Sequence, residues 1–595
     1  MTVHPIDDGS LERFSVHTRP EVRLSATPAF SGHTRAGHTV LIEGEIFGEG
    51  GTPFASPGEE LLTRFLDRGP ASLRSIDGDF VACFVTPDRV RLFKSFTSQY
   101  QLYYRERDRA ISNRLVYLAT GEALIPFDED YFVAHTLIVP GMQFHMGRTP
   151  ISGVNRVLPG ELVELPFRPE EPVNRSQLIS RRYAYKLDAK QRIEDVAPAL
   201  RELLRKTVRD RIAAAKSNRI SVEISGGLDS SLIACLIGEA TSKVTGIMFS
   251  RPDVPSHHIS EGYAREVAER YGIDLHILAP SDLPKVPLAR APYSDEPSDF
   301  FWFGELFAHA TALRVPAGSS VFSGFGADQL FLRSPSFLPY LLAKREFGAF
   351  RNALGPASKL LSRSQVHLSI QSAISQIPRD LYYRLAEPFR KRRWNPLDVG
   401  DVNLHRTLYN PVSWLVRGNE QELFEKERLA AEYHLVGDGI ICDDWGYFAA
   451  PHAVSGPHFQ LGSLRASAPY CDLRLIDFMY DNVSALLIHN FEGRYKELLR
   501  EVAKGILPES LRARKNDMFV FNSFQKEYIE SAAPELEALL QRAPSQWIRS
   551  AEANKALSQL RFGIATSSTR SLIAFFGYMR WRERFTEEAK NLHVV

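Results

Sequence analysis

The sequence predicts an α/β protein in which a β-rich N-terminal domain precedes a parallel-sheet domain with a helical insertion. Short apolar runs broken by turn residues fill the first ~170 residues, and strand-like and helix-like segments alternate after them. At roughly 100 to 200 residues per domain, the 595 residues are enough for two to four domains. We expect domains at 1–170 and 191–595, a linker at 171–190 and the insertion at about 333–460.

The composition excludes several classes of protein. The 72 Lys and Arg and 71 Asp and Glu residues leave a formal charge of +1, whereas nucleic-acid binders normally carry a strong basic excess. No stretch approaches the ~18 consecutive apolar residues of a membrane span, and the first residues do not resemble a signal peptide. The four cysteines lie far apart without a CxxC pair, which indicates neither a disulfide framework nor a zinc site. We expect a cytoplasmic protein with neither a nucleic-acid nor a membrane partner.

Strands in the first domain are predicted from runs rich in β-branched and aromatic residues. These runs are Thr39–Ile42, Phe80–Val85, Val90–Phe93 and Leu162–Leu165. Residues 166–185 then become polar and contain prolines, which suits a linker.

The second domain is predicted to open with a long amphipathic helix, because apolar residues recur at helical spacing from Val196 to Ile212. A β-turn-α-β unit, typical of a parallel sheet, follows it. The further predicted elements are a strand at Ile220–Ile224, a helix with apolar Leu232, Ile233 and Leu236, a strand at Val244–Phe249, a helix at Tyr263–Tyr271, and strands at Leu275–Leu278 and Ser320–Phe322. Most of the insertion is predicted to be helical.

The motif Ser225-Gly226-Gly227-Leu228-Asp229-Ser230-Ser231 lies between a predicted strand and a predicted helix. Glycines there would let the backbone approach phosphate oxygens, helix N–H groups and the two final serines could donate to them, and Asp229 could hold Mg²⁺. A tight turn with an N-cap aspartate would be the default interpretation of a bare Gly-Gly pair. The full motif in this context favours phosphate binding, although it is not a Walker A loop.

This motif resembles the pyrophosphate loop of N-type ATP pyrophosphatases, which cleave ATP between the α and β phosphates to adenylate a substrate. Later segments resemble, in order, the DEP, SGxGxD, VPFLD, KxxLR and LPES segments of asparagine synthetases. They are Asp295-Glu296-Pro297, Ser323-Gly324-Phe325-Gly326-Ala327-Asp328, Ala468-Pro469-Tyr470-Cys471-Asp472, Lys496-Glu497-Leu498-Leu499-Arg500 and Leu507-Pro508-Glu509-Ser510, the last followed by Arg514-Lys515.

The resemblance implies a site for ATP and Mg²⁺. ATP would bind on residues 225–231, with Asp229 and Asp328 as metal ligands and Lys496 stabilising the transition state. The backbone near Met248 would flank adenine. Gly324 and Lys515 would complete the cofactor site. As a bland alternative, a lysine on an amphipathic helix usually faces solvent.

The N-terminal region resembles glutamine-hydrolysing amidotransferase domains of Ntn type. Ile42-Glu43-Gly44-Glu45-Ile46-Phe47 is similar to their VNGEIYN segment, and residues 94–104 are similar to their RDxxGxxPLYY segment. Those enzymes need Cys as residue 2, where this chain has Thr2, and Glu43 and the pair Lys94-Ser95 replace an Asn and an Arg-Asp pair. We expect a degenerate domain that does not hydrolyse glutamine.

Loss of an ammonia supply favours a relative that uses an amine already present on its substrate. Two such groups are β-lactam synthetases and lasso peptide cyclases, which are macrolactam synthetases. Asparagine synthetases carry Glu or Asp at the position of Phe325, and β-lactam synthetases carry a Tyr that helps to deprotonate the nucleophile. Phe325 has no proton to exchange.

The long insertion is the second discriminating feature, because Asp328 and Asp472 are 144 positions apart, more than in asparagine or β-lactam synthetases. An insertion beside the site suits a polypeptide substrate. It contains Tyr409–Leu415, loosely similar to a Pro-x-Trp-Leu segment of lasso cyclases, and the basic run 390–394. A tryptophan is more often part of a core, and a basic run more often a solvated helix face.

We therefore expect a lasso peptide cyclase, with a precursor peptide as substrate and a leader-peptidase or leader-binding protein as partner. A side-chain carboxylate of the peptide would be adenylated, and the peptide's N-terminal amine would then close an isopeptide ring. The alternatives are a β-lactam or asparagine synthetase-like enzyme acting on a small molecule, a tRNA-modifying pyrophosphatase, and a catalytically silent scaffold. Intact Asp229, Asp328 and Lys496 disfavour the scaffold. The general base, the peptide and the ring size are not predicted.

Overall fold

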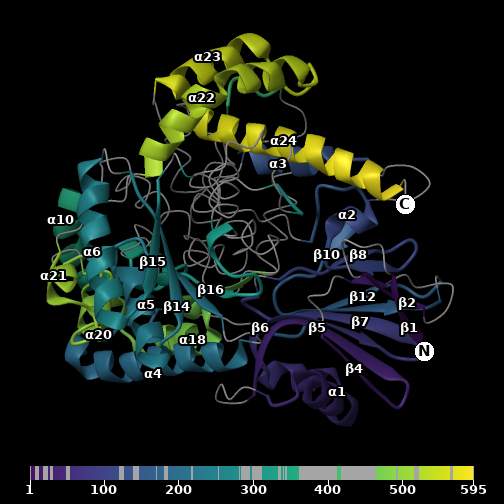
Figure 1. Cartoon of the computed structure of the whole chain (residues 1–595), viewed down its shortest axis with the longest axis horizontal. Helices are drawn as coiled ribbons and strands as arrows, with labels where there is room; N and C mark the ends of the chain where they lie inside the picture. The colour runs from purple at the N-terminus through teal and green to yellow at the C-terminus, as the bar shows by residue number, and fades with distance from the viewer. Residues whose placement is uncertain are drawn as a thin grey trace.

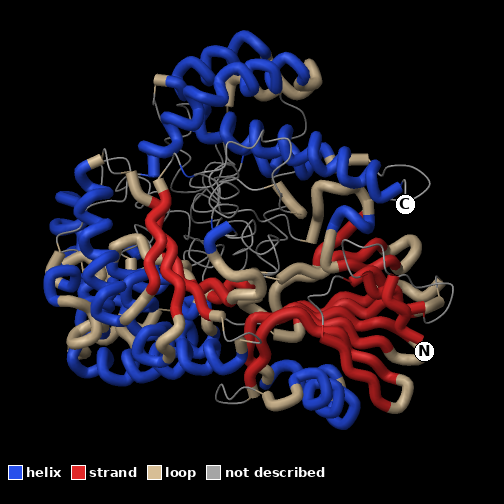
Figure 2. The backbone as a smooth tube through the Cα atoms, in the orientation of Figure 1, coloured by secondary structure: helices blue, strands red, loops and turns tan. Residues whose placement is uncertain are grey.

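The fold is described from a computed structural model of the chain (Figure 1). The residues it describes are 2–6, 13–17, 24–26, 31–48, 54–98, 100–119, 126–137, 147–168, 170–179, 185–215, 219–251, 254–279, 282, 295–297, 311, 313–332, 337–338, 341, 345–360, 412–416, 464–490, 494–514, 521–562 and 567–593. Strands gather on the N-terminal side of the molecule, and helices surround a smaller sheet on the other side (Figure 2).

Two six-stranded sheets are found in the described part of the N-terminal region. In sheet order, the first consists of β1 (Thr2–Ile6), β2 (Arg13–His17), β3 (Leu24–Ala26), β9 (Ala110–Ser112), β8 (Tyr103–Arg105) and β10 (Val154–Arg156). The second consists of β12 (Asn174–Gln177), β11 (Glu161–Pro166), β7 (Arg89–Lys94), β6 (Asp77–Val85), β5 (His38–Phe47) and β4 (Ser31–Arg35). Pairing is antiparallel except between β3 and β9. The four strands predicted here are confirmed.

β6 is buried on both faces of the second sheet, which explains why it is almost continuously apolar. Val81, Cys83 and Val85 point into a core shared with the first sheet, whereas Ala82 and Phe84 on the opposite face belong to the main core. There the helix α1 (Pro57–Arg68) covers the sheet, and its Phe65 ring stacks on Phe84 with centroids 4.0 Å apart.

The segment predicted to be a linker contributes to this sheet. β12 lies inside 171–190 and pairs with β11 through Glu164 and Asn174, so the N-terminal sheet extends to residue 177. An exposed polar edge strand needs no apolar alternation, which is why the sequence pattern did not reveal it. The domain boundaries themselves stay predictions.

The second region contains a five-stranded parallel sheet in order β15-β14-β13-β16-β17, within the described residues. These strands are β13 (Ile220–Glu223), β14 (Val244–Phe249), β15 (Asp274–Leu278), β16 (Ser320–Phe322) and β17 (Arg465–Ser467). The helices beside it are α4 (Ile193–Ala214), α5 (Leu228–Ala240) and α6 (Pro255–Tyr271). The predicted strands and helices are confirmed, except that α6 begins eight residues earlier than expected.

Further helices complete the described part of this region. They are α8 (Ala327–Phe331), α10 (Phe347–Leu360), the 3₁₀ helix η6 (Pro469–Cys471), α18 (Leu473–Asn482), α19 (Ala485–Ile488), α20 (Glu497–Val502) and α21 (Glu509–Arg512). Of the predicted helical insertion, α10 is described and residues 412–416 are not helical. Most of the remainder, including the basic run 390–394, lies outside the described residues.

The C-terminal helices pack on the N-terminal region and not only on their own domain. These helices are α22 (Phe521–Arg542), α23 (Ser550–Arg561) and α24 (Ser567–His593), and α24 lies beside α3 (Glu129–Leu137) (Figure 1). The Phe132 ring stacks on Trp547 with centroids 4.2 Å apart, and Trp414 is fully buried in the same core. Trp414 is thus a core residue, as the bland interpretation expected. Sequence periodicity did not predict this long-range packing.

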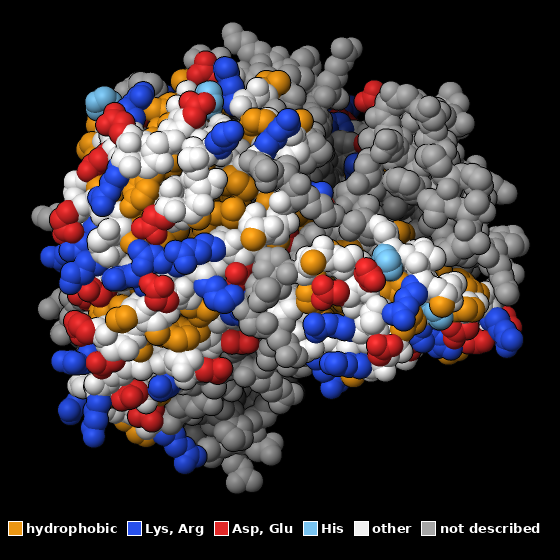
Figure 3. All heavy atoms as spheres, turned by 60° about the horizontal axis from the view of Figure 1, so that its bottom comes forward, with side chains coloured by type: hydrophobic (Ala, Val, Ile, Leu, Met, Phe, Trp, Pro, Cys, Tyr) orange, Lys and Arg blue, Asp and Glu red, His pale blue; other side chains and the backbone are white. Residues whose placement is uncertain are grey.

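The surface reflects the balanced composition. On the face drawn in Figure 3, Lys and Arg side chains are interspersed with Asp and Glu over both regions. Within the described residues, the helices are too short or too polar for any of them to cross a membrane.

Candidate active site

Residues 224–227 connect β13 to α5, and residues 228–231 form the first turn of that helix, so the motif lies between a strand and a helix as the sequence predicts. Gly226 has a φ of +68°, and a Cβ there would lie 1.9 Å from the carbonyl oxygen of Ser260, so only glycine fits. The Ser230 hydroxyl accepts a hydrogen bond from the Ser225 N–H (2.9 Å) and lies 2.8 Å from the Ser225 hydroxyl. The loop is therefore held in shape by its own serines, with the N-terminus of α5 at its end.

A second glycine loop follows β16, the strand beside β13. A Cβ on Gly324 would lie 2.7 Å from the backbone nitrogen of Ser230, so the two loops touch backbone to backbone. Gly326, at a φ of +94°, begins α8. Because neighbouring parallel strands end at the same sheet edge, Asp229 and Asp328 are brought to the same place.

Lys496 joins these two carboxylates. Its Nζ lies 2.5 Å from Asp229 Oδ2 and 2.5 Å from Asp328 Oδ1, and its side chain is 1% exposed. The Lys496 backbone has a φ of +50°, a left-handed conformation that is unfavourable for a non-glycine residue and is often found at functional sites. The interpretation of Lys496 as a solvated surface residue is therefore wrong: this side chain is buried at the strand ends.

Charge and burial act against each other at this cluster. Burial raises the pKa of the Asp229 carboxyl group, and the neighbouring Lys496 ammonium opposes that rise. Burial disfavours the charge on Lys496, but the carboxylates of Asp229 and Asp328 outweigh it and raise the lysine pKa. The lysine consequently stays protonated and can provide a fixed positive charge.

The oxygen atoms present are suitable for a magnesium ion. Asp229 Oδ1 is buried and has no hydrogen-bond partner among the described residues. The described residues hold no group of three or more His, Cys, Asp and Glu side chains that could bind a metal. Two carboxylates still suffice for Mg²⁺, which typically binds one or two of them and takes its other ligands from water and substrate phosphates.

Tyr495 and Arg514 support the cluster, and sequence reasoning assigned no role to either. The Tyr495 hydroxyl lies 3.5 Å from Asp328 Oδ1. Arg514 donates to the carbonyl of Gly226 (2.9 Å) and to the hydroxyl of Ser260 (3.2 Å), which anchors the first loop to α6. The signal available in the sequence was their position, directly before the KxxLR-like segment for Tyr495 and four positions after the LPES-like segment for Arg514.

Two further residues were predicted to bind the cofactor. Met248 is buried and lies one residue before the end of β14, next to β13 in the sheet. Lys515 lies outside the described residues. Their roles stay predictions.

Comparison with known families decides the broader assignment. Residues 199–562, more than half of the chain, match the family described as asparagine synthase. The chain belongs to this family. Membership supports an ATP-dependent, amide-forming ligase in general terms. No protein with a curated description matches the sequence.

Three solved structures are similar to parts of this family member. The NH3-dependent NAD synthetase of Campylobacter jejuni is 10% identical with a TM-score of 0.19, covering 33% of this chain and 98% of its own. The U34-tRNA thiolase NcsA of Methanococcus maripaludis is 15% identical with a TM-score of 0.18, covering 45% and 81%. The glutamine phosphoribosylpyrophosphate amidotransferase of B. subtilis is 12% identical with a TM-score of 0.14, covering 50% and 64%. Scores this low carry no argument.

The DEP-like segment of this family member contacts the N-terminal region. Arg114 Nε lies 2.9 Å from both carboxylate oxygens of Asp295, and the Asp295 carbonyl accepts from Trp581 Nε1 (3.2 Å). Glu296 pairs with Arg156 at 3.0 Å and accepts from the Tyr103 hydroxyl at 2.9 Å. The two buried acidic residues of the DEP-like segment thus contact both the N-terminal region and α24.

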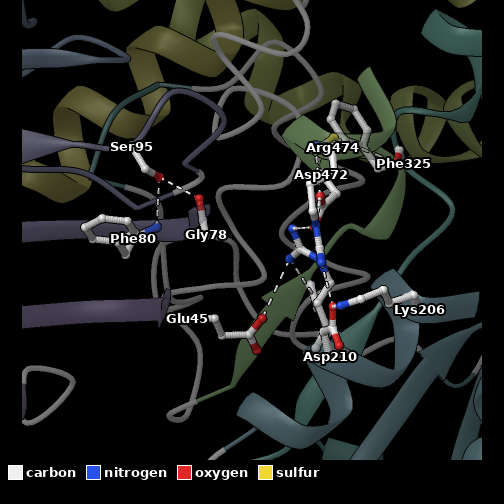
Figure 4. A network of polar contacts seen from close by, with 12 residues as sticks. Glu45, Gly78, Phe80, Ser95, Lys206, Asp210, Phe325, Asp472 and Arg474 are labelled. Atoms are coloured by element: carbon white, nitrogen blue, oxygen red, sulfur yellow. Dashed lines mark hydrogen bonds and ion pairs between the residues drawn. The ribbon is translucent and has the colours of Figure 1, made fainter. Parts of the chain in front are cut away.

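Asp472, in the VPFLD-like segment, is also a structural residue. Its carboxylate caps α18 by accepting from the Arg474 N–H (3.1 Å) and pairs with the side chains of Arg474 (2.8 Å) and Arg211 (3.4 Å) (Figure 4). Hydrogen bonds from Arg474 and the charge of Arg211 outweigh burial and lower the Asp472 pKa. The carboxylate is therefore fully engaged away from Asp229 and Asp328.

The residues that stand in place of those of a glutamine-hydrolysing site make structural contacts within the N-terminal region. Thr2 lies in β1 opposite His17. Half-buried Glu43 accepts from Asn113 Nδ2 (3.2 Å), and the burial of its carboxyl group raises its pKa to about 7. Buried Lys94 donates to Gln101 Oε1 (3.0 Å), and its burial lowers its pKa to about 7.

Ser95 is likewise occupied. It donates to the Gly78 carbonyl (2.8 Å) and accepts from the Phe80 N–H (3.1 Å) (Figure 4).

Proposed function

We propose that this protein adenylates a carboxylate with ATP, releases pyrophosphate and forms an amide, and that its substrate is a peptide closed into a macrolactam as in lasso peptides. The observation that carries the adenylation is the convergence of Asp229 and Asp328 on the buried Lys496 ammonium, at 2.5 Å each. This cluster stands where two glycine loops meet at the ends of neighbouring parallel strands.

Each part of the cluster has a task in this proposal. The ATP phosphates lie on residues 225–231, where backbone N–H groups at the start of α5 donate to them. Asp229 and Asp328 would hold Mg²⁺, which would supply the positive charge that neutralises the departing pyrophosphate. Arg514 keeps the loop in place through the Gly226 carbonyl. Lys496 directs its fixed charge at negative charge that develops during the reaction.

The chemistry requires activation because a free carboxylate is a poor electrophile. A carboxylate oxygen of an Asp or Glu side chain attacks the α-phosphorus, and the bond to pyrophosphate breaks. The peptide's N-terminal amine then attacks the acyl carbon, loses one proton and displaces AMP. The net change in the peptide is the loss of one water.

Two differences from related enzymes support the proposal that the attacking amine belongs to the substrate. Thr2, Glu43 and Lys94 stand at positions where glutamine hydrolysis needs other residues, and the last two are engaged within the N-terminal fold. Phe325 is partly buried against the main core and offers no exchangeable proton. A precursor peptide and a leader-peptidase or leader-binding protein are the partners we propose.

Mass spectrometry of linear peptides tests this proposal. Leader-free peptides with an Asp or Glu several residues from the N-terminus are incubated with ATP and Mg²⁺, and the Asp229→Asn variant is the matched control. We expect loss of one water, a blocked N-terminus and AMP, none of them with the variant. A product with a free N-terminal amine, or ATP turnover only with small β-amino acids, would contradict the peptide assignment.

A further inference from the structure

A buried carboxylate of the N-terminal region faces the helix α4, which lies beside the parallel sheet. Glu45 on β5 is 4% exposed, and neither of its carboxylate oxygens has a hydrogen-bond partner among the described residues. Its Oε2 lies 3.6 Å from Nη1 of Arg211 on α4, whose side chain is 2% exposed. Burying a carboxylate is unfavourable unless it faces a cation, so this pair depends on both regions being in contact.

Charges of alternating sign continue from this pair. Arg211 reaches Asp472 at 3.4 Å, Asp472 pairs with Arg474 at 2.8 Å, and Arg474 pairs with Asp210 at 2.6 Å. Figure 4 shows this network passing from Glu45 toward Phe325.

The same strand makes a second contact with the network. The Phe47 ring lies 5.9 Å from the guanidinium of Arg211 and 5.6 Å from that of Arg474. Glu45 and Phe47 are two positions apart and therefore lie on the same face of β5. One face of this strand thus contacts both arginines.

Asp472 connects this network to both loops of the active site. Asp472 directly follows η6, in which the Tyr470 hydroxyl donates to the carbonyl of Asp229 at 3.3 Å. The Cys471 thiol lies 3.9 Å from the carbonyl of Phe325, and a Cβ on Gly326 would lie 2.8 Å from its sulfur. One short segment therefore contacts the loop of Asp229 and the loop of Asp328.

We propose that Glu45 and Arg211 are positioning residues through which the N-terminal region fixes η6, and with it the two loops that carry Asp229 and Asp328. This inference rests on the proposed function only where catalytic activity is measured. The order of the two loops can be measured by hydrogen exchange whatever reaction the protein catalyses. The N-terminal region thereby contributes to synthesis without supplying ammonia.

The charge state of Glu45 gives a specific test. The groups that face it from the packed elements are Arg211 on α4, Arg465 on β17, Asp472 after η6, Asp79 on β6 and Tyr100. Burial raises the Glu45 pKa from 4.5 to about 7. Protonation as the pH falls through about 7 removes the charge opposite Arg211, so we expect activity to decline there.

As the pH rises toward about 7, we expect the stability contributed by Glu45 to fall while the activity increases. The folded chain holds this proton more tightly than the unfolded chain, so ionising Glu45 lowers the free energy of unfolding as pH rises from 4.5 to about 7. Glu45→Gln keeps Arg211 paired with Asp472 and is expected not to lower Tm at pH 8. A residue that only stabilised the fold would give a lower Tm.

The experiment compares Glu45→Gln and Glu45→Asp with the control Glu164→Gln, which removes an ion pair to Arg91 (2.6 Å) internal to the N-terminal sheet. Hydrogen exchange of residues 225–231 and 323–328 is measured with kcat from pH 6 to 8.5. We expect faster exchange in both loops for Glu45→Gln, kcat lower by roughly 2- to 30-fold, and no decline in its kcat as pH falls through about 7. Glu45→Asp should recover part of the loss, and the control should match the wild type.

Arg211→Lys provides a second test that keeps the charge. Combined with Glu45→Gln it should lower the rate by less than the two single changes added together, because both alter the contact between Glu45 and Arg211. Unchanged loop exchange in Glu45→Gln, or an equal effect in Glu164→Gln, overturns the positioning role whatever reaction is catalysed. Altered loop exchange in a protein that does not form amides overturns the proposed function and leaves the positioning role intact.

Discussion

Replacing Lys496 with methionine removes the ammonium and keeps a long unbranched side chain. Asp229 and Asp328, each 2.5 Å from Nζ, would then face each other without a cation between them. Two consequences follow from the same geometry. The reaction loses a charge aimed at the transition state, and the protein gains two carboxylates that repel each other unless a metal ion or a proton intervenes.

The magnitudes differ for the two consequences. Loss of a preorganised charge-stabilising group typically lowers kcat by about 10² to 10³, or about 2.7 to 4 kcal/mol. Breaking a fully buried pair costs about 3 to 5 kcal/mol of stability. Here the Asp229 and Asp328 side chains are 26% and 56% exposed, so solvent screening makes the loss of stability smaller than this range. Catalysis should therefore suffer more than folding.

The assay is single-turnover formation of AMP, combined with ATP affinity and thermal unfolding with and without Mg²⁺. We expect a large fall in rate, little change in ATP affinity and a greater stabilisation by Mg²⁺ than in the wild type. Lys504→Met, which removes an exposed lysine paired with Glu501, is the control and should change none of these. Lost ATP affinity with an unchanged single-turnover rate would refute the reasoning, because Lys496 would then only anchor ground-state phosphate.

Three further predictions follow from the site. Asp229→Asn and Asp328→Asn should each lower the rate of pyrophosphate release by on the order of 10² to 10⁴, and near-normal turnover in either would remove that residue from the site. Incubation with glutamine should release no glutamate above background, because Thr2, Glu43 and Lys94 replace residues that hydrolysis needs. Phe325→Tyr should not accelerate ring closure if Phe325 only lines the site, and a large gain measured by product mass would show that this position lacks a base.

The sequence predicted those parts of the fold whose periodicity is local. The apolar runs of β5, β6, β7 and β11, and the helical spacing of α4, reflect burial against the cores beside them and could be recognised without tertiary information. β12 and β17 could not, since one is an exposed polar edge strand and the other, Arg-Ala-Ser, has no apolar run. The contact of α24 with α3 joins opposite ends of the chain, which no local pattern records.

The candidate site likewise combines local features that could be predicted from the sequence with long-range contacts that could not. The strand-to-helix placement of residues 225–231 was predictable from local pattern, because a tight glycine turn between a buried strand and a helix is a local feature. The meeting of Asp229 with Lys496, 267 positions apart, was expected only through resemblance to a family. The structural roles of Asp295 and Asp472 emerged only from their arginine partners on other elements.

An oxygen-isotope experiment tests the central claim, adenylation of a substrate carboxylate, most directly. A peptide that the enzyme converts is labelled with ¹⁸O in its Asp or Glu side-chain carboxylate and incubated with ATP and Mg²⁺, and the nucleotide and phosphate products are analysed by mass. Attack of that carboxylate on the α-phosphorus predicts AMP that carries one labelled oxygen atom. Unlabelled AMP, or ADP with label in inorganic phosphate, would contradict the account.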